Sequence, residues 1–247
     1  MKNIPPWYVA AFQDDYLRRY GHRDKAQADA ELPFLMHALD LPRGARVLDL
    51  CCGAGRHSGG LAHAGLIVAG VDLSLPLLLR ARAEHPRPAF VRADMRKLPF
   101  RDETFGGAVN LFTSFGYFEN EHENLAAVRE VARVLKPGGR FVLDFFNLDT
   151  TLPALVPESS RGVEGELIVE RRRFDAARKR LEKETVIERP GAAPARLLES
   201  VRAYAAGELA ALFESAGLAV LARHGDLSGV DFDRQSSPRC VTLGVKK

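Results

Sequence analysis

The stretch from Val47 to Gly60 reads VLDLCCGAGRHSGG, an apolar run that passes two spaced glycines and opens into helical spacing. This pattern predicts a strand, a tight turn and a helix. Gly53 and Gly55 lack the side chains that would keep a ligand away from the backbone, and the helix behind them offers unpaired N–H groups at its positive end. We therefore expect a polar ligand at this turn.

A second apolar run, residues 66–71, ends in Asp72, seventeen residues beyond Gly55. A carboxylate in this position can accept hydrogen bonds from both hydroxyls of a ribose, so the two runs together predict a nucleoside-binding site. Two alternatives remain open. The glycine turn can be purely structural, or it can hold a nicotinamide or flavin cofactor, although Ser58 stands where the dinucleotide-binding fingerprint has a glycine or an alanine.

With these residues the chain resembles the class I S-adenosylmethionine (SAM)-dependent methyltransferases, whose first motif reads apolar-apolar-Asp-apolar-Gly-x-Gly-x-Gly. The motif covers residues 47–55 here, with Cys51 where the family usually has glycine. Since cysteine is small, the turn should survive if the φ angle of Cys51 is negative. The resemblance continues through Asp72, residues 92–100 and residues 135–141, and it implies a Rossmann-like α/β sheet that ends in an antiparallel hairpin.

The resemblance also implies SAM as the cofactor, bound at the carboxyl edge of the sheet. By that resemblance Asp94 accepts a hydrogen bond from the adenine amino group, and the Met95 backbone meets the ring. Taken alone, Asp94 is equally consistent with an ordinary loop acid. The expected cofactor-binding residues are Asp49, Cys51, Gly53, Gly55, Arg56, Asp72, Leu73, Asp94, Met95 and Leu111, with Tyr16 and Tyr20 from the N-terminal segment.

Aromatic residues at positions 8, 12, 16 and 20 predict one aromatic face on a helix that begins at Trp7 and reaches Tyr20. This helix either packs on the domain as ordinary core or lies over the SAM pocket. In the second case Tyr16 or Tyr20 helps to close the pocket, as N-terminal helices do in similar methyltransferases. Another helix is expected from Asp24 to Leu39, with Pro33 as a kink.

Residues 112–118 follow the expected strand Phe105–Leu111 and contain four aromatic residues. Aromatic faces attract cations by roughly 0.5–2 kcal/mol, which suits a sulfonium. Phe115 and Tyr117 are therefore expected to form the acceptor-side wall, with simple packing as the alternative. Asn110 is not followed by the Pro-Pro-Tyr of methyltransferases that act on adenine or glutamine nitrogens, which argues against those acceptors.

No catalytic residue is assigned. The resemblance implies displacement at a carbon that the sulfonium already activates, so the protein mainly has to align and desolvate the reactants. A general base is needed only if the acceptor must lose a proton, and Tyr117, His57 and His122 remain open candidates for it.

The sequence divides into an N-terminal helical segment that covers the pocket (1–40), a SAM-binding α/β core (41–150), an inserted antiparallel β-meander (151–204) and a C-terminal completion of the core (205–247). Three strands are expected in the meander, near 166–174, 180–188 and 196–204. The basic run 171–173 is surrounded by glutamates, which favours a salt-bridged sheet face over a nucleic-acid site. The meander is expected to shape the acceptor site, and a dimerisation sheet is the rival explanation.

The 247 residues suffice for one large α/β domain, and 46% hydrophobic with 27% charged residues is typical of a globular protein. A net charge of +3 is too small to indicate a nucleic-acid partner. The three cysteines lack zinc-ligand spacing, so no metal is expected, and no apolar run is long enough for a membrane helix. We expect a cytoplasmic protein that is a monomer or a homodimer.

These observations together predict a SAM-dependent methyltransferase that acts on a small-molecule acceptor, with RNA and protein acceptors less favoured. A nicotinamide-dependent oxidoreductase and a catalytically inert SAM-binding module remain the alternatives.

Overall fold

The first strand, β1 (Arg46–Leu50), lies inside a seven-stranded sheet and pairs in parallel with β2 (Ile67–Asp72) and β4 (Phe105–Asn110). The computed structural model describes residues 6–13 and 25–247. Parallel pairing continues to β3 (Ala89–Arg92) on one side and β5 (Leu135–Phe146) on the other.

The far side of this sheet is antiparallel. β11 (Arg239–Lys246) pairs antiparallel with β5 and with the edge strand β10 (Leu218–His224). The resulting order, β10-β11-β5-β4-β1-β2-β3, confirms the Rossmann-like sheet and the terminal antiparallel hairpin that the resemblance implies.

Helices cover both faces of the sheet because alternate residues of each strand point to opposite sides. Leu48 and Leu50 share a core with residues of α6 (Glu121–Val134) and α8 (Ala206–Ser215). Val47 packs instead with residues of α3 (Lys25–Leu39) and α4 (Arg56–His63). Burying each such side chain stabilises the fold by about 1.5–3 kcal/mol. α5 (Leu75–Glu84) forms a small third core with Phe90 of β3.

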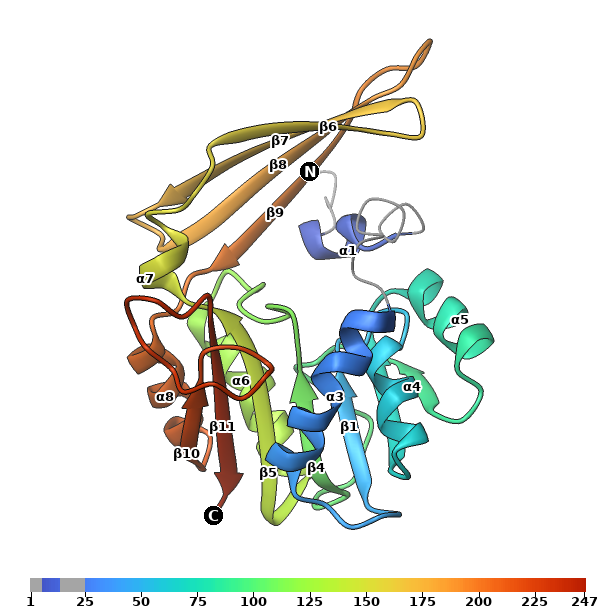
Figure 1. Ribbon diagram of the computed structural model, residues 1–247, viewed down its shortest axis with the longest axis vertical. Coiled ribbons are helices and arrows are strands. Elements are labelled where there is room, and N and C mark those ends of the chain that lie inside the picture. Colours follow the sequence, from blue (N-terminus) through green and yellow to red (C-terminus); the bar gives the residue numbers. More distant parts are fainter. Residues whose placement is uncertain (1–5, 14–24) are drawn as a thin grey trace.

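A second sheet stands above the carboxyl ends of the parallel strands (Figure 1). After β5, the short α7 (Leu148–Thr151) leads into the antiparallel strands β6 (Glu158–Val163), β7 (Glu166–Asp175), β8 (Arg180–Glu188) and β9 (Ala195–Arg202). The helix α1 (Trp7–Ala11) lies between the two sheets and packs against β9 (Figure 1). We call this second sheet the meander.

The meander has four strands, so the prediction of three was wrong. β6 was missed because its sequence, ESSRGV, has no apolar alternation, and its place at the edge of the sheet does not require one. The pairing of basic and acidic residues across the meander was predicted correctly. Arg171 pairs with Glu158 at 2.7 Å, and Arg173 pairs with Glu182 at 2.6 Å, so the basic run is neutralised within the sheet.

Two element boundaries also differ from the prediction. α1 ends at Ala11, and Phe12 leaves the helix with φ −105° and ψ 59°, so the helix does not continue towards Tyr20 as expected. β5 begins at Leu135 instead of Arg140, because a register shift between Phe105 and Gly107 of β4 accommodates the Lys-Pro-Gly-Gly stretch. Pro33 lies inside α3, which runs through it to Leu39.

Within the described ranges, 6–13 and 25–247, no helix has both the length and the apolar character needed to cross a bilayer.

Candidate functional site

A cavity opens at the carboxyl edge of the larger sheet, between the loops that follow β1 to β4 and the N-terminal segment. Seven of the predicted site residues line it, namely Cys51, Gly53, Asp72, Leu73, Asp94, Met95 and Tyr117. The prediction missed nine further lining residues, which are Tyr8, Phe12, Leu50, Val71, Ser74, Leu77, Ala93, Ser114 and Phe118. The carboxylates of Asp72 and Asp94 thus share one cavity, as the ends of adjacent parallel strands require.

The turn after β1 is built from left-handed backbone. Gly53 has φ +55° and Gly55 has φ +79°. Cys51 has φ +58°, so the turn forms although the negative φ on which its survival was made conditional is not present. A residue other than glycine costs roughly 1–2 kcal/mol in this region. Two hydrogen bonds hold the turn in place against that cost: the Cys52 N–H donates to the Val71 carbonyl at 3.0 Å, and the Gly55 N–H donates to the Cys52 carbonyl at 2.9 Å.

Asp72 is held by two backbone donors. The Gly53 N–H donates to Asp72 Oδ2 at 2.9 Å, and the Ser74 N–H donates to Oδ1 at 2.8 Å. Burial raises the pKa of Asp72, and these hydrogen bonds oppose the shift. A carboxylate has about four lone-pair sites, so acceptor capacity remains for a ligand in the cavity.

Ser74 connects this acid to the N-terminal segment. Its hydroxyl caps α5 by accepting from the Leu77 N–H at 3.4 Å, which confirms the predicted N-cap. The same hydroxyl donates to the Phe12 carbonyl at 2.5 Å. The start of α5 therefore fixes Phe12 at the rim of the cavity.

Asp94 carries an ion pair that the sequence did not reveal. Arg96 donates through Nη2 to Asp94 Oδ2 at 2.6 Å and through Nε to Oδ1 at 3.0 Å. Burial pushes the pKa of Asp94 upward, but the hydrogen bonds from Arg96 outweigh it and hold the pKa below its usual value. The Arg96 guanidinium also pairs with Glu123 and lies 4.2 Å from the ring centre of Phe118.

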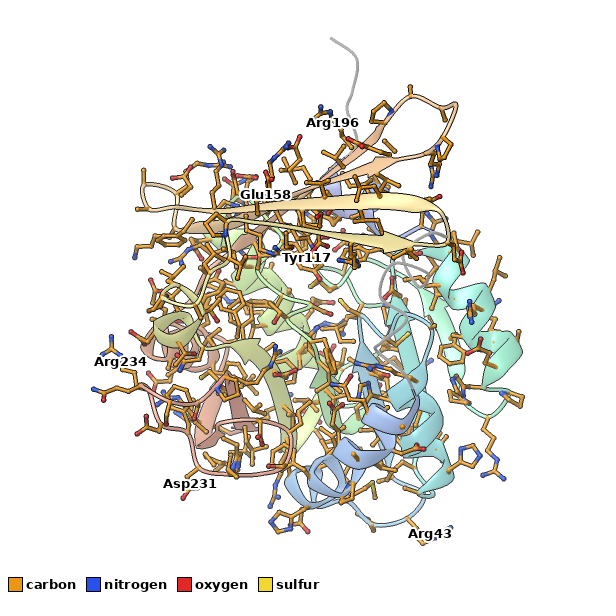
Figure 2. All side chains as sticks on the ribbon, turned by 45° about the horizontal axis from the view of Figure 1, so that its top comes forward. Arg43, Tyr117, Glu158, Arg196, Asp231 and Arg234 are labelled. Atoms are coloured by element: carbon orange, nitrogen blue, oxygen red, sulfur yellow. The ribbon has the colours of Figure 1, made fainter. Side chains whose placement is uncertain are left out.

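Four aromatic side chains line the cavity, namely those of Tyr8, Phe12, Tyr117 and Phe118. The ring of Tyr117 lies 4.9 Å from Trp7, 5.8 Å from Phe12 and 6.3 Å from Tyr8, measured between ring centres. Figure 2 shows Tyr117 at the level between the meander and the larger sheet. Of the four aromatic residues that recur at every fourth position of the N-terminal segment, Tyr8 and Phe12 line the cavity, whereas Tyr16 and Tyr20, which we expected to close the pocket, lie outside the described residues.

Two predicted cofactor residues lie beneath the glycine turn and do not line the cavity. Asp49 is 3% exposed and accepts a hydrogen bond from the Ser58 hydroxyl at 2.5 Å, which ties β1 to the first turn of α4. Gly55 caps α4, and a Cβ atom there would lie 2.8 Å from the Phe90 ring. Asp49 and Gly55 therefore support the turn without bordering the cavity.

The structure also places Arg56, Leu111 and Phe115 outside the cavity lining. The Arg56 guanidinium stacks 4.0 Å over the ring of Phe112, and Leu111 is buried with α3 and α4. Phe115 was expected in the acceptor wall, but it is 3% exposed and packs in the core, 5.6 Å from the ring of Tyr204. Tyr117 borders the cavity while Phe115, two residues earlier, fills the core, because Gly116 between them has left-handed backbone at φ +80° and interrupts the extended alternation.

The histidine candidates for a general base do not line the cavity either. His57 is buried and lies 2.7 Å from Glu31, and His122 is exposed near the start of α6. Of the three candidates only Tyr117 borders the cavity.

The loop after β4 is strained. Phe112 and Thr113 both have left-handed backbone, with φ +58° and +59°. Asp144, fully buried in β5, accepts from the Phe112 N–H through Oδ2 at 2.8 Å, and its carbonyl accepts from the Thr113 N–H at 3.0 Å. Such strain persists only where surrounding contacts hold it, and it is concentrated at ligand sites. Here it directs the chain from β4 to Ser114 at the cavity.

Chemically, the cavity combines backbone N–H groups at a glycine turn, two acids at adjacent strand ends and an aromatic wall. The acids and the turn suit the hydroxyls and amino groups of a nucleoside. The rings suit a cation or a planar ligand beside it.

Comparison with known proteins agrees with this geometry. A family model described as a methyltransferase domain matches residues 47–139. Demethylmenaquinone methyltransferase from Streptomyces griseus is 37% identical over 116 residues, which cover 47% of this chain and 49% of that protein. The chain spans about half the length of the curated relatives it matches.

Solved structures match nearly the whole chain. The CcbJ methyltransferase from Streptomyces caelestis has a TM-score of 0.77 at 22% identity, covering 91% of this chain and 98% of that one. SAM-bound CalS10, an amino pentose methyltransferase from Micromonospora echinaspora, has a TM-score of 0.69 at 23% identity and covers 96% and 98%. At these identities the likeness establishes the fold, including the meander.

Proposed function

Because the chain carries a methyltransferase domain of the class I SAM-dependent family, we propose that it transfers the methyl group of SAM to a small-molecule acceptor. The observation that carries this proposal is the meeting of Gly53, Asp72 and Asp94 in one cavity beneath an aromatic wall. SAM supplies a methyl group that its sulfonium has already activated. The residues of this chain have to bind the cofactor, orient the acceptor and exclude water.

The cofactor side of the cavity follows from the two acids. Asp72, oriented by the Gly53 and Ser74 N–H groups, accepts hydrogen bonds from the ribose hydroxyls through its remaining lone pairs. Asp94 accepts from the adenine amino group, and Arg96 keeps this carboxylate ionised and fixed in orientation. Gly53 lets the cofactor approach the backbone, because no side chain projects into the cavity there.

The acceptor side is the aromatic wall. Tyr8, Phe12, Tyr117 and Phe118 border the cavity, and their faces suit the sulfonium and a small acceptor placed beside it. Holding both reactants in line provides an effective molarity of roughly 10⁵–10⁸ M, so alignment supplies most of the rate. The meander helps to shape this side, since it holds the loop that carries Tyr117.

Calorimetric titration tests the cofactor assignment. The protein should bind SAM and should not bind NAD, whereas NAD binding without SAM binding would favour the oxidoreductase alternative. An acceptor screen should then release S-adenosylhomocysteine from SAM with at least one small molecule. SAM binding without turnover across a broad panel would favour the inert binding module. Light scattering of the same sample tests whether the meander serves as a dimer interface.

A further inference from the structure

Arg180, the first residue of β8, is buried at 2% exposure and reaches from the meander into the loop that carries Tyr117. Its Nη1 donates to the Phe118 carbonyl at 2.9 Å, and its Nη2 donates to the Tyr117 carbonyl at 3.2 Å. Nε donates to the Ser200 hydroxyl at 2.7 Å, and Nη2 also donates to the Ser200 carbonyl at 2.5 Å. Every one of these acceptors is a neutral oxygen.

Carboxylates contribute little to holding this charge. The nearest carboxylate that pairs with Arg180 is Glu119, whose Oε1 lies 4.0 Å from Nε, at the limit of an ion pair. Glu119 is exposed and is already paired with Arg178 at 2.6 Å. Burial of a guanidinium is costly unless its donors are satisfied, and here the loop carbonyls satisfy them. The loop therefore cannot move away without leaving a buried charge unsolvated.

The same loop is clamped on either side of Tyr117. The Arg202 N–H donates to the Gly116 carbonyl at 2.7 Å, and a Cβ atom on Gly116 would lie 2.8 Å from the Arg202 carbonyl oxygen. On the core side, the Asn124 amide donates to the Phe118 carbonyl at 3.2 Å and accepts from its N–H at 3.3 Å. Arg180 supplies the link from the meander to the Tyr117 carbonyl itself.

We propose that Arg180 is a positioning residue, which fixes the Tyr117 ring at the acceptor side of the cavity and so couples the meander to the acceptor site. The part of this proposal that concerns the acceptor rests on the proposed function. The positioning itself does not rest on the proposed function, because it concerns only where the ring of Tyr117 lies with and without Arg180.

The chain provides its own reporter of that position. Trp7 is the single tryptophan in the sequence, and its ring lies 4.9 Å from Tyr117. Arg180→Met should shift Trp7 emission to longer wavelength and raise its quenching by acrylamide, because the indole ring loses the cover of the Tyr117 ring. Tyr117→Leu should give the same change. The double variant should match Tyr117→Leu alone, whereas a merely structural arginine would add a further change.

Arg196→Met is the matched control. Arg196 belongs to the same sheet but pairs with Glu184 at 2.8 Å, and Figure 2 shows it at the outer end of the meander, away from Tyr117. This variant should leave emission and quenching unchanged. Wild-type fluorescence in Arg180→Met, or equal changes in Arg180→Met and Arg196→Met, would overturn the proposal.

Two further measurements keep the outcome decisive. If Arg180→Met does not fold, Arg180→Lys keeps the charge but cannot span the same carbonyls, so its quenching should lie between wild type and Tyr117→Leu. A lysine variant identical to wild type would count against the proposal. Equilibrium dialysis with radiolabelled SAM should give the same dissociation constant for Arg180→Met as for Tyr117→Leu, because both changes take the Tyr117 ring away from the cavity. Absence of SAM binding in the wild type would refute the proposed function and leave the fluorescence result standing.

Discussion

Gly53→Ala places a methyl group where the turn after β1 faces the cavity. No atom outside the adjacent residues lies within 4 Å of the added Cβ, so the fold loses only the cost of left-handed backbone at φ +55°, about 1–2 kcal/mol. For a chain of this length that lowers the melting temperature by about 2–8 °C. A cofactor that approaches this backbone meets the methyl group, and overpacking of about 1–3 kcal/mol weakens SAM binding about 5–150-fold.

Gly55→Ala is the matched control, because Gly55 is also left-handed but does not line the cavity. Its Cβ would lie 2.8 Å from Phe90 Cζ and 3.1 Å from Ala81 Cβ, so overpacking adds to the backbone cost and the loss of stability reaches about 2–5 kcal/mol. Thermal unfolding and calorimetric titration should therefore rank the two variants in opposite orders. Gly55→Ala loses more stability, and Gly53→Ala loses more SAM affinity. Normal SAM binding by Gly53→Ala would show that the turn does not face the cofactor.

Three further outcomes are expected from titration with SAM. Asp72→Ala should bind about 10–100-fold more weakly, since a hydrogen bond to a charged group contributes roughly 1.5–3 kcal/mol, and unchanged affinity would remove Asp72 from the site. Because burial raises the pKa of Asp72, while hydrogen bonds from Arg96 keep Asp94 ionised, wild-type affinity should be full above the pKa of Asp72. It should fall as the pH drops through that value, beginning above the ordinary aspartate value of about 3.9, and an affinity that stays constant until the pH is below about 3.9 would contradict this assignment. Cys51→Gly relieves about 1–2 kcal/mol of left-handed strain and adds an entropy cost of about 0.5–1 kcal/mol for the glycine. The stability of the fold and the affinity for SAM should therefore both stay near wild type. A large loss of either would show that the thiol is needed.

The sequence predicted the strands and the helix cap around the glycine turn well, because these elements are built from local patterns. The apolar runs before Asp49 and Asp72 form β1 and β2, and Ser74 caps α5 as expected. The φ angle of Cys51 could not be predicted, since residue size does not reveal that this turn needs left-handed backbone throughout. Arg96 was missed for a similar reason. An arginine two residues after an acid is common on surfaces, and only the folded chain shows that it fixes Asp94.

The aromatic side of the cavity depends on contacts between residues far apart in the sequence, which no local pattern predicts. The hydrogen bond from Ser74 to Phe12 and that from Arg180 to Phe118 each join residues 62 positions apart. Aromatic spacing identified the N-terminal segment, but the helix ends at Ala11, which leaves Tyr8 and Phe12 to border the cavity. The burial of Phe115 likewise depends on Tyr204, far along the chain.

The family model covers only part of the residues that surround the cavity. The region that matches the family model, residues 47–139, contains Asp72, Asp94 and Tyr117, but it contains neither Phe12 nor Arg180. Relatives that match this core match the range that contains both acids and Tyr117, while the segments that hold and cover Tyr117 lie outside it. Similarity over the core therefore does not by itself assign the methylation of demethylmenaquinone to this chain. If the proposed function holds, the acceptor lies where the N-terminal segment, the loop after β4 and the meander meet, so an acceptor screen is best run alongside variants of Tyr8, Tyr117 and Arg180.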